Sequence, residues 1–448
     1  MSSFVFAALE PEEFDEFGKT SPQGNFQQTS RMGLLRAKHG SQVKFFGVKS
    51  GEKIVAAAAM EFRKARSGTK CSICDGPLCD LNNAELTEFF FSNLKKAAKE
   101  QKAVSLEITP ETVYCKRDSN GEQIGEKNNG IVENLANAGF VHTGFTKGYT
   151  AVPRWRYVKD VSQFADEKQL LKSYDKRTQW SVKRSRSMGV KIRELSLDEL
   201  EIFSNIEEQT AQRRGFKARN AQYFRDFALC FKDKVHYVIA YVDCAEFLEQ
   251  SRAKMLETEE KVRKIREKIQ TRETTKLVRA LGEEERNLQA AKRRFDEAQK
   301  LAEQSKGQSK ELFSGQARDY RDSQCDSQRS SQTSLQSGIV TVAASMFVEH
   351  PREVVYLFSG SIEEYKSFYG PVLIQHWAME NLCLKNRIGR YNFYGISGVF
   401  DDPDDEGRGV LEFKQGFGGY VEELAGEFEM PVRPLLYKVS QAAGKILG

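Results

Sequence analysis

The stretch RYNFYGISGVF, residues 390 to 400, is followed after a short acidic loop by LEFKQGFGGY, residues 411 to 420. The first stretch is typical of a strand that ends in glycines, because aromatic and β-branched residues are frequent in it. The second stretch places Lys414 in a turn rich in Phe and Gly, with Phe413 and Phe417 beside it. An ammonium among aromatic side chains can approach a developing negative charge with little competing water. Lys414 is therefore the first candidate for a functional residue.

The length and composition of the chain indicate a globular protein with two domains or more. Its 448 residues exceed what one hydrophobic core usually organises, and 40% of them are hydrophobic. Lys and Arg total 68 against 63 acidic residues, which is too small an excess to identify a nucleic-acid-binding protein. No run approaches the roughly 18 apolar residues of a membrane helix, and the N-terminus does not resemble a signal peptide. We therefore expect a cytoplasmic protein.

The cysteines and histidines form no recognisable metal or nucleophile site. Cys71, Cys74 and Cys79 cluster in CSICDGPLC, but no second pair of ligands completes a tetrahedral zinc set. The five histidines stand in unrelated contexts, and no glycine motif for dinucleotide or nucleotide binding is present. The sequence therefore predicts neither a metal ion nor a cofactor.

Strand-like and helical runs alternate in the first third of the chain, which predicts an α/β or α+β domain. VKFFGVKS, KIVAAAAMEF and AVSLEITP are strand-like, whereas ELTEFFFSNLKKAAKEQ carries apolar residues at helical spacing. After PRWRYVKD the chain enters a second unit, in which IVTVAASMFV and EVVYLFSG resume strand character and PVLIQHWAMENLCLKN is helical.

A basic segment opens the second unit. From Lys176 to Arg193 there are seven basic residues and no acidic one. An ordinary solvated helix face mixes both signs, so this run beside Trp180 favours a surface that binds a polyanion such as an RNA backbone. An exposed basic helix without a ligand is the alternative. The residues proposed to bind RNA are Lys176, Arg177, Lys183, Arg184 and Arg186.

Apolar residues recur every seven positions within residues 246–303. One series is Leu248, Met255, Val262 and Ile269, and the other is Leu281, Leu288, Phe295 and Ala302. TRETTK, residues 271–276, breaks the register between them, which favours an antiparallel coiled-coil hairpin over one long rod. The segment that follows is rich in Ser, Gln and Gly, and we expect residues 304–337 to be a polar linker.

Several long motifs follow one another along the chain: NLANAGFVHTGFTKGYT, PRWRYVKDV, KRTQWSVKRSRSMGVKI, RYNFYGISGVF and FKQGFGGYVEELAGEFEMPVRPLLYK. Taken together and in this order, they resemble the Fem family of peptidoglycan interpeptide-bridge aminoacyltransferases. The resemblance covers nearly the whole chain apart from residues 304–337, and the inserted arm resembles the staphylococcal and streptococcal members.

The resemblance implies an α/β (α+β) fold of two N-acetyltransferase-like domains with an inserted coiled-coil arm. The expected units are a first domain of residues 1–153 completed by 425–448, a second domain of 154–245 and 338–424, the arm of 246–303 and the linker of 304–337. The implied activity is transfer of an amino acid from aminoacyl-tRNA to an amine of a peptidoglycan precursor stem peptide or growing bridge, without a cofactor. A lipid-linked precursor would bring the cytoplasmic protein to the inner face of the membrane. Whether it forms a homodimer, or a heterodimer with a related transferase, stays open.

The resemblance also implies roles for individual residues. Lys414, with Phe413 beside it, matches the family lysine that assists peptide-bond formation. Arg219 and Tyr223 match an arginine and a tyrosine that hold the precursor's diphosphate, and Arg36 falls where a shorter relative has a phosphate-contacting lysine. Tyr369 is a further candidate for lining the cleft, with a place in the core as the alternative.

One departure from the family keeps a second hypothesis open. Thr109 stands where relatives often carry aspartate, and Glu107 lies on the same strand face by the period of two. If a carboxylate is needed there, the chain could be an inactive scaffold of the same fold that binds tRNA or a partner. An acyl-CoA-dependent N-acetyltransferase is a third alternative, but the glycine loop that cradles a pyrophosphate is missing.

Overall fold

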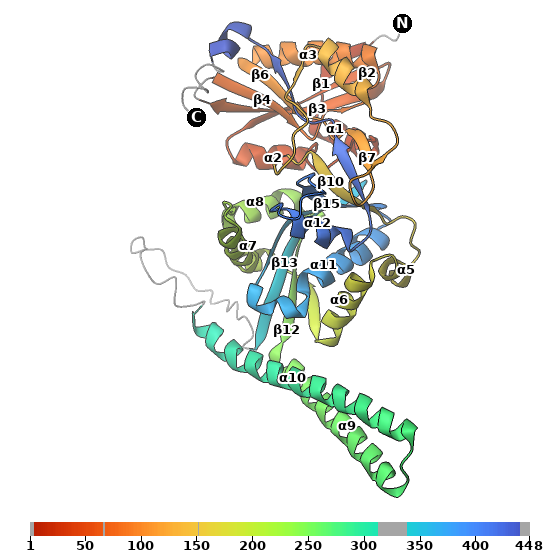
Figure 1. Ribbon diagram of the computed structural model, residues 1–448. Coiled ribbons are helices and arrows are strands. Elements are labelled where there is room, and N and C mark those ends of the chain that lie inside the picture. The colour runs from red at the N-terminus through yellow and green to blue at the C-terminus, as the bar shows by residue number, and fades with distance from the viewer. Residues whose placement is uncertain (1–3, 66–67, 151, 312–337, 440–448) are drawn as a thin grey trace, which may run out of the picture.

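The computed structural model describes residues 4–65, 68–150, 152–311 and 338–439. Within these residues the chain forms two β-sheets with helices packed on them, and two long helices that project from the second sheet, away from the first (Figure 1). This arrangement is the predicted one of α/β domains with an inserted helical arm. None of the described helices is long and apolar enough to cross a membrane.

The first sheet has eight strands among the described residues, in the order β1-β2-β3-β4-β6-β17-β9 with β5 paired to β3. Its helix α3 (Ala84–Glu100) buries Phe90, Phe91 and Leu94 in the core of this sheet. The other helices are α1 (Pro11–Thr20), α2 (Ser30–Lys38) and α4 (Asn129–Asn137). The strands are β1 (Phe4–Ala8), β2 (Gln42–Ser50), β3 (Lys53–Ala65), β4 (Gly68–Cys74), β5 (Leu78–Cys79), β6 (Ala103–Thr109), β9 (Val141–His142) and β17 (Phe428–Pro431).

The second sheet has nine strands among the described residues, in the order β11-β12-β13-β14-β15-β10-β16-β7-β8. These are β7 (Val113–Arg117), β8 (Gln123–Ile124), β10 (Trp155–Asp160), β11 (Val190–Glu194), β12 (Val235–Asp243), β13 (Ile339–His350), β14 (Glu353–Ser361), β15 (Arg390–Ile396) and β16 (Tyr420–Leu424). The helices are α5 (Glu167–Lys172), α6 (Lys176–Ser187), α7 (Leu200–Arg214), α8 (Ala221–Phe231), α11 (Gly370–Ala378) and α12 (Arg408–Gln415). Short 3-10 turns span Leu197–Glu199, Lys232–Lys234 and Glu363–Phe368, and a π-helical turn spans Met379–Leu384.

The second sheet separates two hydrophobic cores, because successive residues of its central strands point to opposite faces. Val238 and Ala240 of β12 face the core shared with α6 and α11, whereas Tyr237 and Ile239 face the core shared with α7 and α8. This second core also takes in Phe26, Met32 and Leu35 from the α2 region of the first domain. The two domains are therefore joined by apolar packing between α2 and α8.

One of the predicted domain boundaries has to be moved. β17 lies within residues 425–448, which were expected to complete the first domain, and it pairs antiparallel with β6 of the first sheet. β7 and β8 lie within residues 1–153, yet β7 pairs with β16 and both strands belong to the second sheet. Residues 113–124 therefore have to be assigned to the second domain, because their hydrogen-bonding partners are there.

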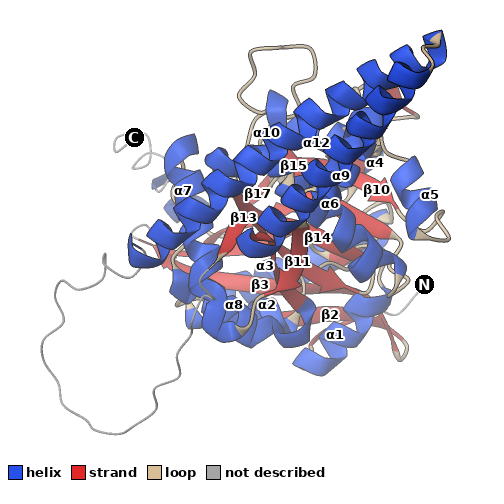
Figure 2. Ribbon diagram, turned by 90° about the horizontal axis from the view of Figure 1, so that it is seen from below, coloured by secondary structure: helices blue, strands red, loops and turns tan. Residues whose placement is uncertain are grey.

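Two antiparallel helices form the arm, and they lie side by side in both views (Figures 1 and 2). They are α9 (Cys244–Thr271) and α10 (Thr275–Glu311), joined by a short turn at the predicted break. Val262 of α9 and Ala291 and Ala298 of α10 are buried, and Arg266 pairs with Glu285 across the hairpin at 2.6 Å. The predicted linker starts too early, since α10 continues through its first eight residues, 304–311. Residues 312–337 lie outside the described part of the chain.

Candidate functional site

Lys414 lies at the end of a helix and not in the glycine turn that the sequence predicted. The segment RGVLEFKQ forms α12, and its buried side chains Leu411 and Lys414 stand three residues apart on one face. The glycine turn, residues 416–419, begins directly after this helix. The loop is formed by the acidic residues that precede α12. Lys414 itself belongs to the helix and is therefore presented from a rigid element.

The Lys414 amine is buried and faces backbone carbonyls. Its side chain belongs to a residue that is only 4% exposed, and its Nζ donates hydrogen bonds to the carbonyl oxygens of Gly395 at 2.5 Å and Tyr394 at 3.4 Å. Among the described residues no carboxylate forms an ion pair with it. Burial lowers the pKa of Lys414 to about 7, so both the ammonium and the neutral amine are accessible near neutral pH.

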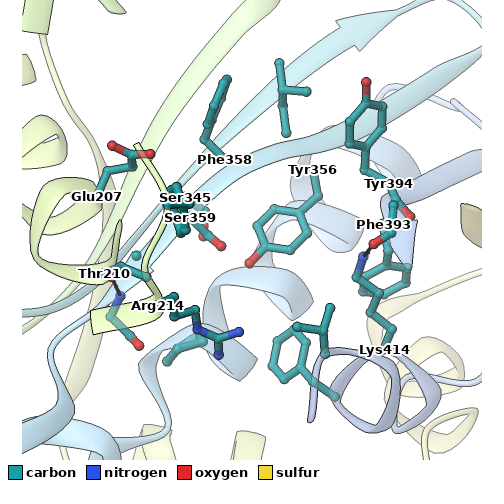
Figure 3. A pocket seen from close by; sticks show the side chains of 18 of the residues that line it. Glu207, Thr210, Arg214, Ser345, Tyr356, Phe358, Ser359, Phe393, Tyr394 and Lys414 are labelled. Atoms are coloured by element: carbon teal, nitrogen blue, oxygen red, sulfur yellow. Dashed lines mark hydrogen bonds between the residues drawn. The ribbon is translucent and has the colours of Figure 1, made fainter. Parts of the chain in front are cut away.

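A cavity of about 520 Å³ opens beside Lys414, which we call cavity 1 (Figure 3). Phe413 and Lys414 of α12 line one side of it, and the other side is formed by α7. The strands β13, β14 and β15 form its floor through Ser345, Tyr356, Ser359, Phe393 and Tyr394. Both residues that the sequence assigned to catalysis therefore lie in one cavity.

The turn that follows α12 is fixed from two directions. The carbonyl of Gly416 accepts a hydrogen bond from the backbone N–H of Asp175, just before α6, at 2.9 Å. The Nζ of Lys159, on β10, donates to the carbonyls of Phe417 and Gly418, both at 2.8 Å. Buried backbone carbonyls need hydrogen-bond donors, so this turn is well anchored.

A second cavity, of about 870 Å³, lies between the two domains and brings together three of the predicted residues. We call it cavity 2. Arg36 reaches it from α2, Tyr223 from the first turn of α8, and Arg219 from the segment just before that helix. The Arg219 guanidinium lies 5.0 Å from the centre of the Tyr223 ring, and burial raises the pKa of Tyr223.

Arg36 is only partly neutralised in cavity 2. It donates to the Oε1 of Gln27 at 2.8 Å and lies 3.4 Å from the carboxylate of Glu61. Its Nη1 is buried and has no hydrogen-bond partner among the described residues. With Arg219 in the same cavity, two guanidinium groups are available to an anionic ligand, and their planar forks suit phosphate oxygens.

Thr109 and Glu107 also line cavity 2, on the face of β6 that the period of two predicted. The hydroxyl of Thr109 accepts a hydrogen bond from the backbone N–H of Asp75 at 3.0 Å, and Glu107 lies 3.5 Å from Lys70. Glu427 and Glu429 of the β17 region line the same cavity. Carboxylates are therefore present around Thr109, although the sequence alone did not single out the last two.

Leu357, Phe358 and Tyr394 line both cavities, so the two spaces adjoin. Tyr394 sits in the left-handed region with φ 64°, and its ring packs against the guanidinium of Arg156 at 5.3 Å. A group held in cavity 2 can therefore meet a group held in cavity 1 at these three side chains.

Tyr369 lines neither cavity. It packs edge to face against Trp180 of α6, with ring centres 5.3 Å apart, and it precedes α11 in the left-handed conformation. Tyr369 therefore lies outside both described cavities, and the alternative of a place in the core does not fit either, because its side chain is only half-buried and packs on the exposed Trp180. The sequence neighbour that does reach cavity 1 is Pro371.

The basic segment forms α6 and β11, and its charges are partly paired. Arg186 pairs with Glu167 at 3.0 Å, and Lys191 and Arg193 also have acidic partners. The four remaining residues make no ion pair with the described part of the chain. They are Lys176, Arg177, Lys183 and Arg184. The positive surface is therefore narrower than the sequence indicated and is concentrated on α6.

Sequence reasoning missed part of cavity 1. Glu207 of α7 is 2% exposed and lines the cavity, and its Oε2 has no hydrogen-bond partner among the described residues. Arg214 and Tyr356 line the same cavity and are visible with Glu207 in Figure 3. No local motif marks these residues, because they come from different elements that only the fold brings together.

Comparisons with known proteins agree with this architecture. The chain is 28% identical to "Aminoacyltransferase FemA" of Staphylococcus aureus (strain bovine RF122 / ET3-1) over 448 residues, covering 98% of each chain. The protein of the same name from strain N315 matches with the same identity and coverage.

A solved structure, "Crystal structure of FemX", superposes with a TM-score of 0.72 at 20% identity, covering 97% of this chain and 99% of that one. This likeness confirms the predicted overall fold of two α/β domains, and the helical arm is present as α9 and α10. The sequence profile of the FemAB family matches residues 9–314 and 316–445. Because this match extends over almost the entire sequence, the chain belongs to the FemAB family.

Proposed function

We propose that the chain is a tRNA-dependent aminoacyltransferase. It moves an amino acid from aminoacyl-tRNA to the amine of a peptidoglycan precursor, either on the stem peptide or on the growing interpeptide bridge. The observation that carries the proposal is the pair of adjoining cavities, one with a buried lysine and the other with two arginines. The relatives named above as aminoacyltransferases support it.

The chemistry needs little beyond positioning and charge stabilisation, because an aminoacyl ester is already activated. The neutral acceptor amine attacks the ester carbonyl, a C–N bond forms, and the ester C–O bond to the ribose then breaks. The proton of the amine ends on the ribose hydroxyl that leaves. The Lys414 ammonium stabilises the oxyanion formed between these steps, and one such donor typically contributes about 10²- to 10³-fold in rate.

The acceptor occupies cavity 2 in this proposal. A diphosphate between Arg36 and Arg219 would satisfy the unpartnered Nη1 of Arg36. The lipid-linked form of the precursor carries such a diphosphate, and a lipid anchor would hold the protein at the inner face of the membrane.

In this proposal the donor tRNA lies along the basic surface of α6. Its aminoacylated end enters cavity 1 beside Lys414 and Phe413, while its backbone phosphates contact α6. Unpaired lysines and arginines on one helix favour this placement, since phosphate contacts dominate the affinity for nucleic acids. No bound cofactor takes part.

The test is transfer of a labelled amino acid from charged tRNA. tRNAs charged with Gly, Ala, Ser and Thr would each be incubated with the protein and with two acceptors, the lipid-linked unmodified precursor and the same precursor carrying one bridge residue. The proposal predicts label on the acceptor amine for at least one combination. Tight, salt-dependent tRNA binding without transfer in any combination would favour the inactive scaffold.

A further inference from the structure

Lys159 is a second buried lysine, and it stands outside both cavities. It lies on β10 and is 4% exposed, with its Nζ over the rings of Phe164 at 4.9 Å and Tyr174 at 5.5 Å. No carboxylate of the described residues forms an ion pair with it, and burial lowers its pKa to about 8. A lysine placed there without an acidic partner costs stability, so its contacts need an explanation other than general packing.

Those contacts are directed at the end of α12. The Nζ of Lys159 donates hydrogen bonds to the carbonyls of Phe417 and Gly418, and the backbone N–H of Asp175 donates one to the carbonyl of Gly416. Three successive carbonyls of the turn are thus satisfied by donors from β10 and from the start of α6. The buried lysine therefore acts as a clamp on this turn.

The glycines of this turn leave little room for the turn to lie anywhere else. A Cβ at Gly416 would meet the hydroxyl of Thr178 at 2.3 Å, and one at Gly419 would meet the carbonyl of Val158 at 2.4 Å. Gly418 has φ +70°, and its Cβ would lie 2.9 Å from the carbonyl of Ser173. The glycines let the turn approach β10 and the segment before α6, and Lys159 then holds it there.

We propose that Lys159 is a positioning residue for the transfer reaction, fixing the C-terminal end of α12 so that the Lys414 amine is directed at cavity 1. This inference rests on the role of Lys414 in the proposed function. α12 is a short helix of 8 residues, and Lys414 stands only three residues before Phe417. A shift of the clamp therefore moves the amine directly, and a displacement of about 1 Å in a reacting group can cost about 100-fold in rate.

The experiment is a double-mutant cycle with Lys159→Met and Lys414→Met in the full-length chain. Single-turnover transfer is measured with saturating charged tRNA and lipid-linked precursor. Lys159→Met is expected to lower the rate roughly 10- to 100-fold, with KM for both substrates changed less than about twofold. The double variant is expected to be as slow as Lys414→Met alone, because Lys159 acts only through Lys414. Lys172→Met, an exposed lysine of α5, is the matched control and should retain the wild-type rate.

Two results would overturn the inference while leaving the proposed function intact. One is a wild-type rate in Lys159→Met when Lys414→Met is slow. The other is a further loss in the double variant equal to that of Lys159→Met alone, which indicates a merely structural role. If Lys414→Met itself transfers normally, the proposed role of Lys414 fails and the inference fails with it. Should Lys159→Met not fold, the same cycle is run with Lys159→Gln, whose amide can still donate to one carbonyl and whose rate should fall between those of the wild type and Lys414→Met.

Discussion

Lys414 has the properties of a residue retained for function at the expense of stability. Its amine is buried without an acidic partner, and its folded pKa of about 7 lies well below the value near 10.5 of a free lysine. Between these two values the unfolded chain binds a proton that the folded chain does not. The stability contributed by this site therefore rises as pH increases from about 7 to about 10.5, and the full penalty is present below pH 7.

Replacing this lysine should consequently stabilise the protein. Lys414→Met fills a similar volume without a charge, so its free energy of unfolding at pH 6.5 should exceed that of the wild type by on the order of 2 to 4 kcal/mol. The difference should shrink as the pH approaches 10. Urea unfolding at pH 6.5, 8 and 9.5 measures it, with the exposed Lys53→Met as control. A Met variant that is less stable than wild type at every pH would contradict the described burial.

The arginines of cavity 2 lead to a separate prediction, which concerns how the acceptor is bound. Arg219→Gln should raise KM for a diphosphate-linked precursor roughly 10- to 100-fold, because a charge-assisted hydrogen bond is lost. KM for the same muropeptide without the diphosphate should change little. Lys217→Gln, two residues away and outside both cavities, is the matched control. Equal losses with both acceptors would exclude a phosphate role for Arg219.

At the scale of elements, α6 carries the sequence-predicted RNA surface. Arg177→Gln and Lys183→Gln should each weaken tRNA binding and reduce the slope of log K against log salt concentration by about 0.7 to 0.9. Arg186→Gln should have a smaller effect, because Glu167 already neutralises that guanidinium. Filter binding of charged tRNA across a salt series distinguishes these cases. An unchanged slope in both Arg177→Gln and Lys183→Gln would show that α6 is not part of the tRNA interface.

Sequence patterns predicted the helices and strands themselves better than they predicted which strands pair with each other. The period of two in AVSLEITP and the heptads of the arm were correct, since each pattern reports which side of one element is buried. The assignment of residues 113–124 failed because strand pairing with β16 is set by residues about 300 positions away, and no local pattern encodes it. Lys414 was placed in a turn because glycines follow it closely, whereas the eight residues up to Gln415 are helical.

The candidate site could be predicted only where a family motif named its residues. Arg36 is far in sequence from Arg219 and Tyr223, and the three residues meet in cavity 2. Glu207 and Lys159 carry no motif, and their importance is visible only from burial and hydrogen bonding. The sequence could not place Tyr369, because an aromatic residue near a glycine fits a cleft and a packed interface equally well.

At the scale of the whole molecule, a buried ion network joins the two domains. Arg156 of β10 pairs with Asp75 at 2.6 Å and with Glu111 at 2.8 Å, and all three side chains are almost inaccessible. Arg390 continues the network with Glu353 and Glu422. Because Tyr394 packs on Arg156, the network also supports the wall between the two cavities.

Removing one carboxylate from this network should be costly. Asp75→Asn leaves Arg156 buried with one partner fewer, so the free energy of unfolding should fall by about 3 kcal/mol. Asp233→Asn breaks an exposed pair with Arg31, also between the domains, and should cost less than about 1 kcal/mol. Chemical denaturation of both variants measures the contrast, and equal losses would indicate that burial of the network contributes nothing.

Single-turnover transfer by Lys414→Met, compared with wild type, tests the central claim most directly. A preformed complex of the protein with labelled charged tRNA is mixed with the lipid-linked precursor, and label on the precursor is followed in time. The account predicts transfer by the wild type and a rate about 100-fold or more lower in the variant, with binding of both substrates retained. A variant that transfers at the wild-type rate, or a wild type that transfers from none of the charged tRNAs, would contradict it.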